Sequence, residues 1–85
     1  MPVISRFYGI VIMMYFKDHN PPHIHAKYAG YEALLTFDGA LIDGELPTRA
    51  LRLVRGWLLC HHLELMDNWE RAQVGLALDY ISPLE

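Results

Sequence analysis

The sequence predicts a small α+β domain in which an antiparallel β-meander of three to four strands packs on one long α-helix. Two hairpin signals, Ala29-Gly30 and Asp38-Gly39, place the apolar residues of consecutive strands on one common face. An apolar stripe then runs through residues 48–73 at spacings of three and four, which is typical of an amphipathic helix. No linker, repeat or low-complexity tract interrupts residues 1–85, so we expect a single domain.

The composition limits the size of the core and indicates which kinds of partner the protein can have. A chain of 85 residues can bury only one small core, and a hydrophobic content of 53% is high for that size. The apolar surface that remains favours a homo-oligomer or a stable complex with a partner protein. The net charge of −3 does not indicate general nucleic-acid binding. The single cysteine, Cys60, excludes an internal disulfide and fits a reducing cytoplasm.

The apolar run at residues 7–16 is about half the length of a membrane span. It is followed by Lys17-Asp18-His19, where a signal peptide would carry small residues before its cleavage site. We therefore expect no membrane segment and a cytoplasmic location.

The first strands are predicted as follows. Residues 1–8 fit either an edge strand or a tail. Residues 9–16 are apolar on both alternating faces, as in a central strand covered on both sides, and their β-branched content favours a strand over a buried helix turn. A two-residue turn at Ala29-Gly30 gives a defined register: Tyr28 opposite Tyr31, Ala26 opposite Ala33, and Ile24 opposite Leu35. A bulge in that turn would shift this register and is left open.

The second half of the chain supplies one more strand and the helix. A two-residue turn at Asp38-Gly39 would pair Phe37 with Ala40 and Leu35 with Ile42. A single helix is predicted from about Thr48, its candidate N-cap, to about Gln73, with a length of roughly 39 Å. Gly56 in this helix is expected to mark a close approach to the sheet, and Trp57 lies at the margin of the stripe. Residues 76–81 could add a short final strand. The stripe consists of Leu51, Val54, Leu58, His61, Leu65, Trp69 and Ala72.

Residues 16–25 indicate a functional site. They read Phe-Lys-Asp-His-Asn-Pro-Pro-His-Ile-His. Pro21 and Pro22 fix two φ angles and remove two backbone donors, which excludes helix and inner strand. They are expected to form a stiff, extended crossover onto the strand that begins at His23. One surface patch is therefore predicted to contain Asp18, His19, His23 and His25.

His23 and His25 are two residues apart on one strand, so their rings point to the same side of the sheet. Two such imidazoles can bind a zinc ion, with Asp18, His19 or His61 as further ligands. They could equally form a solvent-facing or hydrogen-bonded pair without a metal, and no cofactor is predicted. In the register above, His61 lies on the opposite side of the sheet and cannot join them.

Arg49, Arg52 and Arg55 recur every three residues on one face of the predicted helix. Basic residues at a helix N-terminus oppose the helix dipole, so helix stability does not explain them. They could recognise an acidic partner or a phosphate, or be neutralised by Asp43 and Glu45. With His23 and His25 they also suggest a ribonuclease, in which imidazoles transfer protons and arginines stabilise phosphate charge.

The run at residues 16–25 resembles the opening signature of a bacterial family catalogued as domain of unknown function 4160. The resemblance covers nearly the whole chain, and it implies a gene beside that of a second small protein, as in a toxin–antitoxin-like or regulatory pair. His62 and the Gly75-Leu76-Ala77 stretch depart from the pattern. Further similar positions are Gly44-Glu45-Leu46-Pro47, Arg49-Ala50-Leu51, Trp57, His61, Glu64-Leu65, Asn68-Trp69 and Ile81-Ser82-Pro83-Leu84.

Two classes of function follow from these patterns. The first is a binding or regulatory module of a toxin–antitoxin-like pair, and its candidate binding residues are Asp18, His19, His23, His25, Arg49, Arg52 and Arg55. The second is a small histidine-dependent ribonuclease with the catalytic candidates His23, His25, Arg49 and Arg52. A His-x-His metal-binding protein, with His19, His23 and His25 as ligands, is the third alternative. Whether the chain is an enzyme, and whether it binds nucleic acid, stays open.

Overall fold

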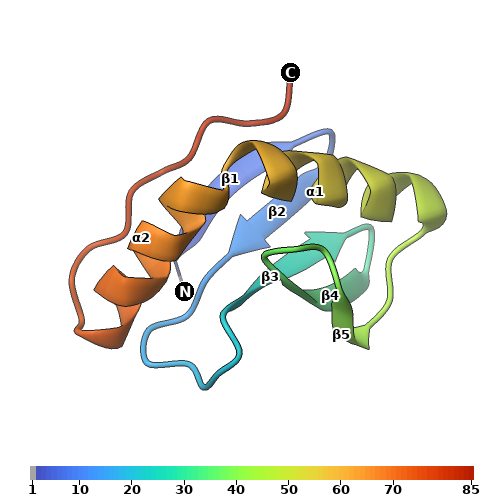
Figure 1. The fold of residues 1–85 in the computed structure, drawn as a ribbon. Helices are drawn as coiled ribbons and strands as arrows, with labels where there is room; N and C mark the ends of the chain where they lie inside the picture. Colours follow the sequence, from blue (N-terminus) through green and yellow to red (C-terminus); the bar gives the residue numbers. More distant parts are fainter. Residues whose placement is uncertain (1) are drawn as a thin grey trace.

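A computed structural model describes residues 2–85 as one five-stranded antiparallel sheet and two helices (Figure 1). The strands follow one another across the sheet in chain order: β1 (Val3–Phe7), β2 (Ile10–Met13), β3 (His23–Tyr28), β4 (Tyr31–Thr36) and β5 (Leu41–Gly44). Helices α1 (Thr48–Cys60) and α2 (His62–Gln73) follow, and Figure 1 shows both on the same side of the sheet. The predicted α+β class and antiparallel meander are confirmed. The expected three to four strands and single helix are wrong.

The two tight hairpins have the same turn geometry. Tyr8 and Gly9 join β1 to β2, and Ala29 and Gly30 join β3 to β4, with φ values of 51°, 81°, 48° and 86°. Positive φ at both central positions defines a type I′ turn, whose twist matches that of the flanking strands. The predicted β3–β4 register is confirmed, because Tyr28 pairs with Tyr31 and the pairing continues without a bulge to His23 and Thr36.

The second predicted register is wrong by one residue. Leu35 pairs with Leu41 rather than with Ile42, because the loop contains three residues instead of two. The N–H of Gly39 donates to the carbonyl of Thr36, Gly39 has a φ of 91°, and the N–H of Thr36 donates to the carbonyl of Ala40. This is a type I turn closed by a left-handed glycine, the usual three-residue hairpin loop. Farther along, a bulge leaves Ile42 between the paired residues Leu41 and Asp43.

The predicted long helix is broken at His61, where φ is −126° and ψ is 27°. A straight helix over residues 48–73 would be about 39 Å long, whereas the longest dimension of the molecule is 33 Å. The break therefore allows α2 to turn and pack against the same body as α1. No helix within residues 2–85 is both long enough and apolar enough to cross a membrane.

The core lies between the sheet and the two helices. Trp57, predicted at the margin of the apolar stripe, is fully buried and packs on Phe7 with 5.6 Å between ring centroids. Gly56 does not approach the sheet: a Cβ at this position would have no neighbour within 4 Å, so that expectation is wrong. Other fully buried side chains include Ile4, Ile10, Ile12, Ile24, Leu35, Val54, Leu58, Leu65 and Ile81.

The C-terminal segment lies along the outside of the domain as an extended chain, and the short final strand predicted at residues 76–81 is not formed. The buried Asn68 side chain holds it by two hydrogen bonds of 2.9 Å, one to the N–H and one to the carbonyl of Asp79. Trp57 Nε1 donates to the carbonyl of Ser82, and the N–H of Ile81 donates to the carbonyl of Ile4 in β1. This segment therefore covers the β1 edge of the sheet, as the red ribbon in Figure 1 shows.

Candidate functional site

Asp18, His23 and His25 converge on one point at the start of β3. One carboxylate oxygen, Asp18 Oδ2, lies 3.0 Å from Nε2 of His23 and 3.1 Å from Nε2 of His25. Each residue offers one ligand atom, and the three atoms all lie within 4.8 Å of one another. Around a tetrahedral ion with bonds of ~2.0–2.1 Å, neighbouring ligand atoms are about 3.3–3.5 Å apart. The cluster is therefore close to the size of a metal-coordination sphere.

The backbone of the β2–β3 loop (residues 14–22) positions Asp18. The N–H of Lys17 donates to the carbonyl of Ala72 at the end of α2, and Gln73 Nε2 donates to the carbonyl of Asp18. Lys17 has a φ of 55°, which turns the chain so that Asp18 faces the strand. The second oxygen of Asp18 accepts the N–H of His19. These hydrogen bonds between the loop and the end of α2 hold the carboxylate of Asp18 in place.

The protonation of His23 follows from its neighbour Pro21. His23 Nδ1 lies 2.7 Å from the carbonyl oxygen of Pro21, which can only accept a hydrogen bond, so Nδ1 carries the proton. In the neutral ring, Nε2 then bears a lone pair that faces the carboxylate of Asp18. Two such electron pairs at 3.0 Å require a positive charge between them, supplied either by an imidazolium proton or by a metal ion.

His25 has a different second neighbour. Its Nδ1 is buried and makes no hydrogen bond, but it lies 3.6 Å from the carboxylate of Glu32 on β4. A carboxylate beside the outer nitrogen of a metal-binding histidine orients the ring and raises its basicity. Glu32 is in position for this role, because it is one strand away on the same face of the sheet.

Aromatic rings close the inner side of the cluster. Tyr15 meets His25 edge to face, with 4.3 Å between ring centroids, and Trp69 of α2 lies 5.5 Å from His23. His23 is only 4% exposed, so the alternative of a solvent-facing histidine pair does not hold for this residue. The reason is the break at His61, which directs α2 toward the beginning of β3.

The outer side of the cluster opens into a hollow of about 240 Å³, smaller than the range of about 300–1,000 Å³ typical of drug-sized ligands. Leu34 of β4 and the bulged Ile42 of β5 form its apolar wall, and the predicted residues Asp18, His19, His23 and His25 all line it. The four residues therefore lie together in space.

The ionisation of Asp18 reflects these contacts. Partial burial by itself raises the pKa of this carboxyl. Hydrogen bonds from His25 and from the His19 backbone, together with the nearby charge of the two imidazoles, outweigh burial and lower the pKa below its ordinary value. Asp18 is therefore ionised at neutral pH and can act as an anionic ligand.

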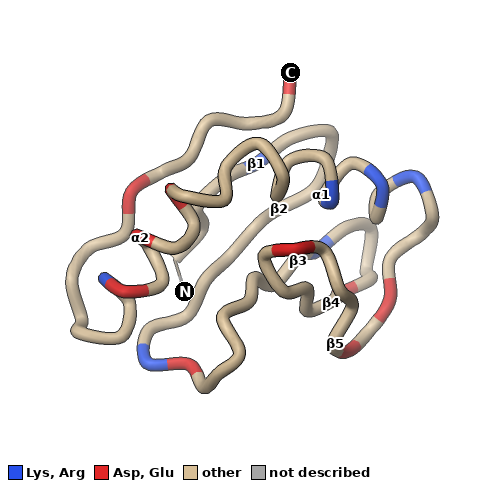
Figure 2. The backbone as a smooth tube through the Cα atoms, in the orientation of Figure 1, with Lys and Arg blue, Asp and Glu red and all other residues tan. Residues whose placement is uncertain are grey.

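Of the other sequence candidates, His19 lies at the edge of this cluster, whereas His61 and the arginines lie apart from it. His19 is 96% exposed and has its Nδ1 3.6 Å from Asp18. His61 bonds to Glu64 and packs on Trp57, which agrees with the prediction that it cannot join His25. Figure 2 shows the basic positions of α1 near its N-terminal end, far from the β2–β3 loop. The structure therefore does not bring Arg49, Arg52 and Arg55 together with the histidines, and Arg55 instead donates to the carbonyl of Gly39.

Three contributors were not identified as site residues from the sequence: Tyr15, Glu32 and Trp69. The predicted register already placed Glu32 on the face of His25, which could have indicated its role. Nothing in the helical stripe could have shown that Trp69 reaches His23, because that contact depends on the break in the helix.

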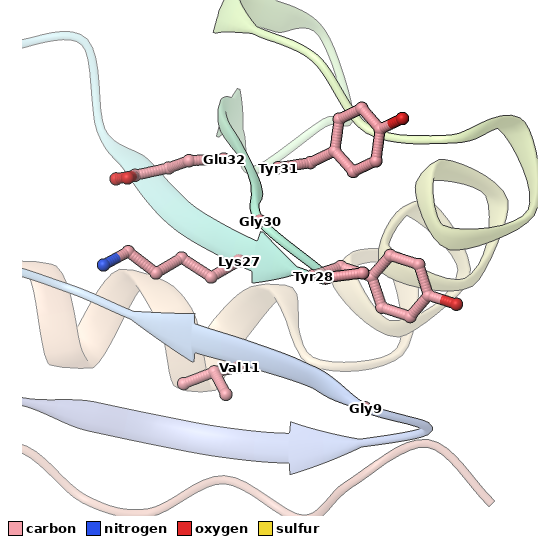
Figure 3. A pocket seen from close by; sticks show the side chains of 8 residues that line it. Gly9, Val11, Lys27, Tyr28, Gly30, Tyr31 and Glu32 are labelled. Carbon is pink, nitrogen blue, oxygen red and sulfur yellow. The ribbon is translucent and has the colours of Figure 1, made fainter.

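A second hollow lies at the turns that join β1 to β2 and β3 to β4. Figure 3 shows Lys27 and Glu32 extending side by side from β3 and β4, near Val11, while Tyr28 and Tyr31 point to the other side. It is lined by turn backbone and contains no histidine, so we do not regard it as the chemical site.

Comparison with known proteins supports the family resemblance. A protein-family model described as Domain of unknown function (DUF4160) matches residues 9–70, which is well over half of the chain and includes Asp18, His23 and His25. No curated protein and no solved structure matched the chain. The chain therefore belongs to the family described as Domain of unknown function (DUF4160).

Proposed function

We propose that this protein binds a divalent transition-metal ion through Asp18, His23 and His25. The observation that carries the proposal is the convergence of His23 Nε2 on Asp18 Oδ2 while Pro21 holds the proton on Nδ1. In the neutral ring this leaves a lone pair and a carboxylate facing each other, which is the arrangement of two ligands around a shared cation.

The donor set indicates the class of metal. Two imidazole nitrogens and one carboxylate oxygen suit zinc, iron, nickel or copper, whereas magnesium and calcium prefer oxygen ligands. The outer nitrogen of a metal-binding histidine usually contacts a backbone carbonyl or a carboxylate. Here Nδ1 of His23 contacts the carbonyl of Pro21, and Nδ1 of His25 lies near the carboxylate of Glu32. Ligand residues and supporting contacts thus point to the same function.

The test is the titration of metal-free protein with zinc. We expect one zinc ion per chain, and at least about a 100-fold loss of affinity for the His25→Ala variant, because one of three ligands is removed. His62→Ala is the matched control, since it deletes an exposed histidine outside the cluster and should bind like the wild type. Equal zinc binding by all three proteins, or none by the wild type, would refute the proposal and leave a His23–Asp18 ion pair as the role of the cluster.

A second proposal is that the protein acts through a partner protein in the cytoplasm, as a regulatory or toxin–antitoxin-like module. Leu59 and Leu63 support it, because these large apolar side chains are 78% and 83% exposed on either side of the helix break. The two leucines are only four positions apart in the chain, at the end of α1 and the start of α2, and they give this bend an exposed apolar patch.

Affinity capture from a lysate of the native organism tests the partner proposal. The wild type should retain a specific protein that the Leu59→Asp, Leu63→Asp double variant loses. Val74→Asp, which changes another exposed apolar residue, should retain it. Equal capture by all three proteins would contradict a role for this patch.

A further inference from the structure

We infer that the metal site is open, and that its ion takes a small exogenous anion or water from the hollow that the β2–β3 loop forms with Leu34 and Ile42. This inference rests on the proposed metal binding and specifies the ligand class of the same site. It follows from the number of protein ligands, from the side on which the cluster is closed, and from its charge.

The number of ligands leaves coordination positions free. Within residues 2–85, the cluster that could hold a metal contains three residues, Asp18, His23 and His25. Structural zinc sites use four protein ligands, whereas sites that bind water or substrate use three. His19 has its side chain in solvent, and its Nδ1 lies 3.6 Å from Oδ1 of Asp18 rather than from Oδ2, the oxygen that contacts both imidazoles.

The free coordination positions of a bound ion would all face the same side of the cluster. The rings of Tyr15 and Trp69 close the inner side of the cluster against His25 and His23. The opposite side is the hollow of about 240 Å³, whose wall is formed by Leu34 and Ile42. An exogenous ligand must therefore enter between the β2–β3 loop and the side chains of Leu34 and Ile42, and the hollow admits only a small one.

The net charge of the bound ion and its protein ligands favours an anionic exogenous ligand. A divalent ion bound by one carboxylate and two neutral imidazoles keeps a net charge of +1. Pro21, Leu34 and Ile42 add no charge to the hollow. The carboxylate of Glu32 faces the outer nitrogen of His25 and is 44% exposed, so water screens it from the ion. The uncompensated charge attracts hydroxide, a carboxylate or a phosphate oxygen to the open position.

Cobalt(II) and azide test the inference, because the visible d–d bands of protein-bound cobalt respond to a change of ligand. We expect azide to shift the spectrum of the cobalt-loaded wild type. Ile42→Phe should fill the hollow and weaken azide binding about tenfold while cobalt affinity is unchanged. Leu41→Phe is the matched control, because Leu41 is the neighbouring exposed residue of β5 but does not line the hollow.

The results that would contradict the open site differ from those that would contradict metal binding. Cobalt binding without any response to azide, together with a changed spectrum in His19→Ala, would show a closed site with His19 as the fourth ligand. That result would overturn the open site and leave metal binding intact. Failure of the wild type to bind cobalt or zinc would overturn metal binding itself.

Discussion

Gly44 is the residue at which a single methyl group should be most damaging. It has a φ of 75° and lies opposite Ala33, where β5 joins the sheet. A Cβ at this position would be 2.1 Å from the carbonyl oxygen of Glu32 and 3.0 Å from Cα of Ala33. Both are backbone atoms, so neither can move away by a change of rotamer. Gly44→Ala should therefore separate β5 from β4.

The expected magnitude has two parts. A left-handed conformation costs a non-glycine residue about 1–2 kcal/mol. The carbonyl of Glu32 also accepts the N–H of Glu45, and moving it should lose that hydrogen bond at a cost of about 1 kcal/mol. Gly44→Ala should thus lower the free energy of unfolding by roughly 2–3 kcal/mol, which corresponds to a fall in Tm of about 10 °C or more for a domain of this size.

Thermal and urea unfolding followed by circular dichroism would measure this effect. Gly56→Ala is the matched control, because a Cβ there has no neighbour within 4 Å and the residue lies inside α1. Alanine should stabilise that helix by about 0.5–1 kcal/mol. A Gly44→Ala protein that melts within about 2 °C of the wild type, a shift that corresponds to less than about 0.5 kcal/mol, would refute the reasoning about the β4–β5 contact.

Three further predictions concern the turn, the C-terminal segment and the metal site. Ala29→Asn should raise the free energy of unfolding by about 0.5–1 kcal/mol, because asparagine tolerates the positive φ of 48° better than alanine does; an unchanged urea midpoint would contradict this. Asn68→Ala should lower it by about 1–3 kcal/mol through the loss of two hydrogen bonds to Asp79, and limited proteolysis should cleave the C-terminal segment faster. Glu32→Gln should weaken zinc binding about tenfold in calorimetric titration, with little change in stability; equal affinity would exclude a role for this carboxylate.

The β3–β4 hairpin could be predicted because two independent features agree. The alternation of apolar residues selects one face, and a two-residue turn at Ala29-Gly30 gives the same register. The β4–β5 hairpin shows where such reasoning fails. Asp38-Gly39 suits a two-residue turn, but Gly39 also suits the last position of a three-residue loop, which the side chain of Thr36 further stabilises by accepting the N–H of Ala40.

The helix break could not be predicted from periodicity, because the apolar stripe passes through His61 without interruption. The break is evident only in the folded structure, whose longest dimension of 33 Å is shorter than the roughly 39 Å of a straight helix over residues 48–73. The candidate site could likewise be predicted only in part from the sequence. Its histidines were evident from residues 16–25, but the contacts of α2 that fix Asp18 and cover His23 depend on the direction that α2 takes after the break.

The most direct test of the central proposal is a crystal structure of the zinc-loaded protein, with data collected above and below the zinc absorption edge. We predict one anomalous difference peak among Asp18, His23 and His25, about 2.0–2.2 Å from Oδ2 and from both Nε2 atoms. A density map from zinc-saturated crystals with no anomalous peak there, and with Asp18 still in direct contact with both imidazoles, would contradict the proposal.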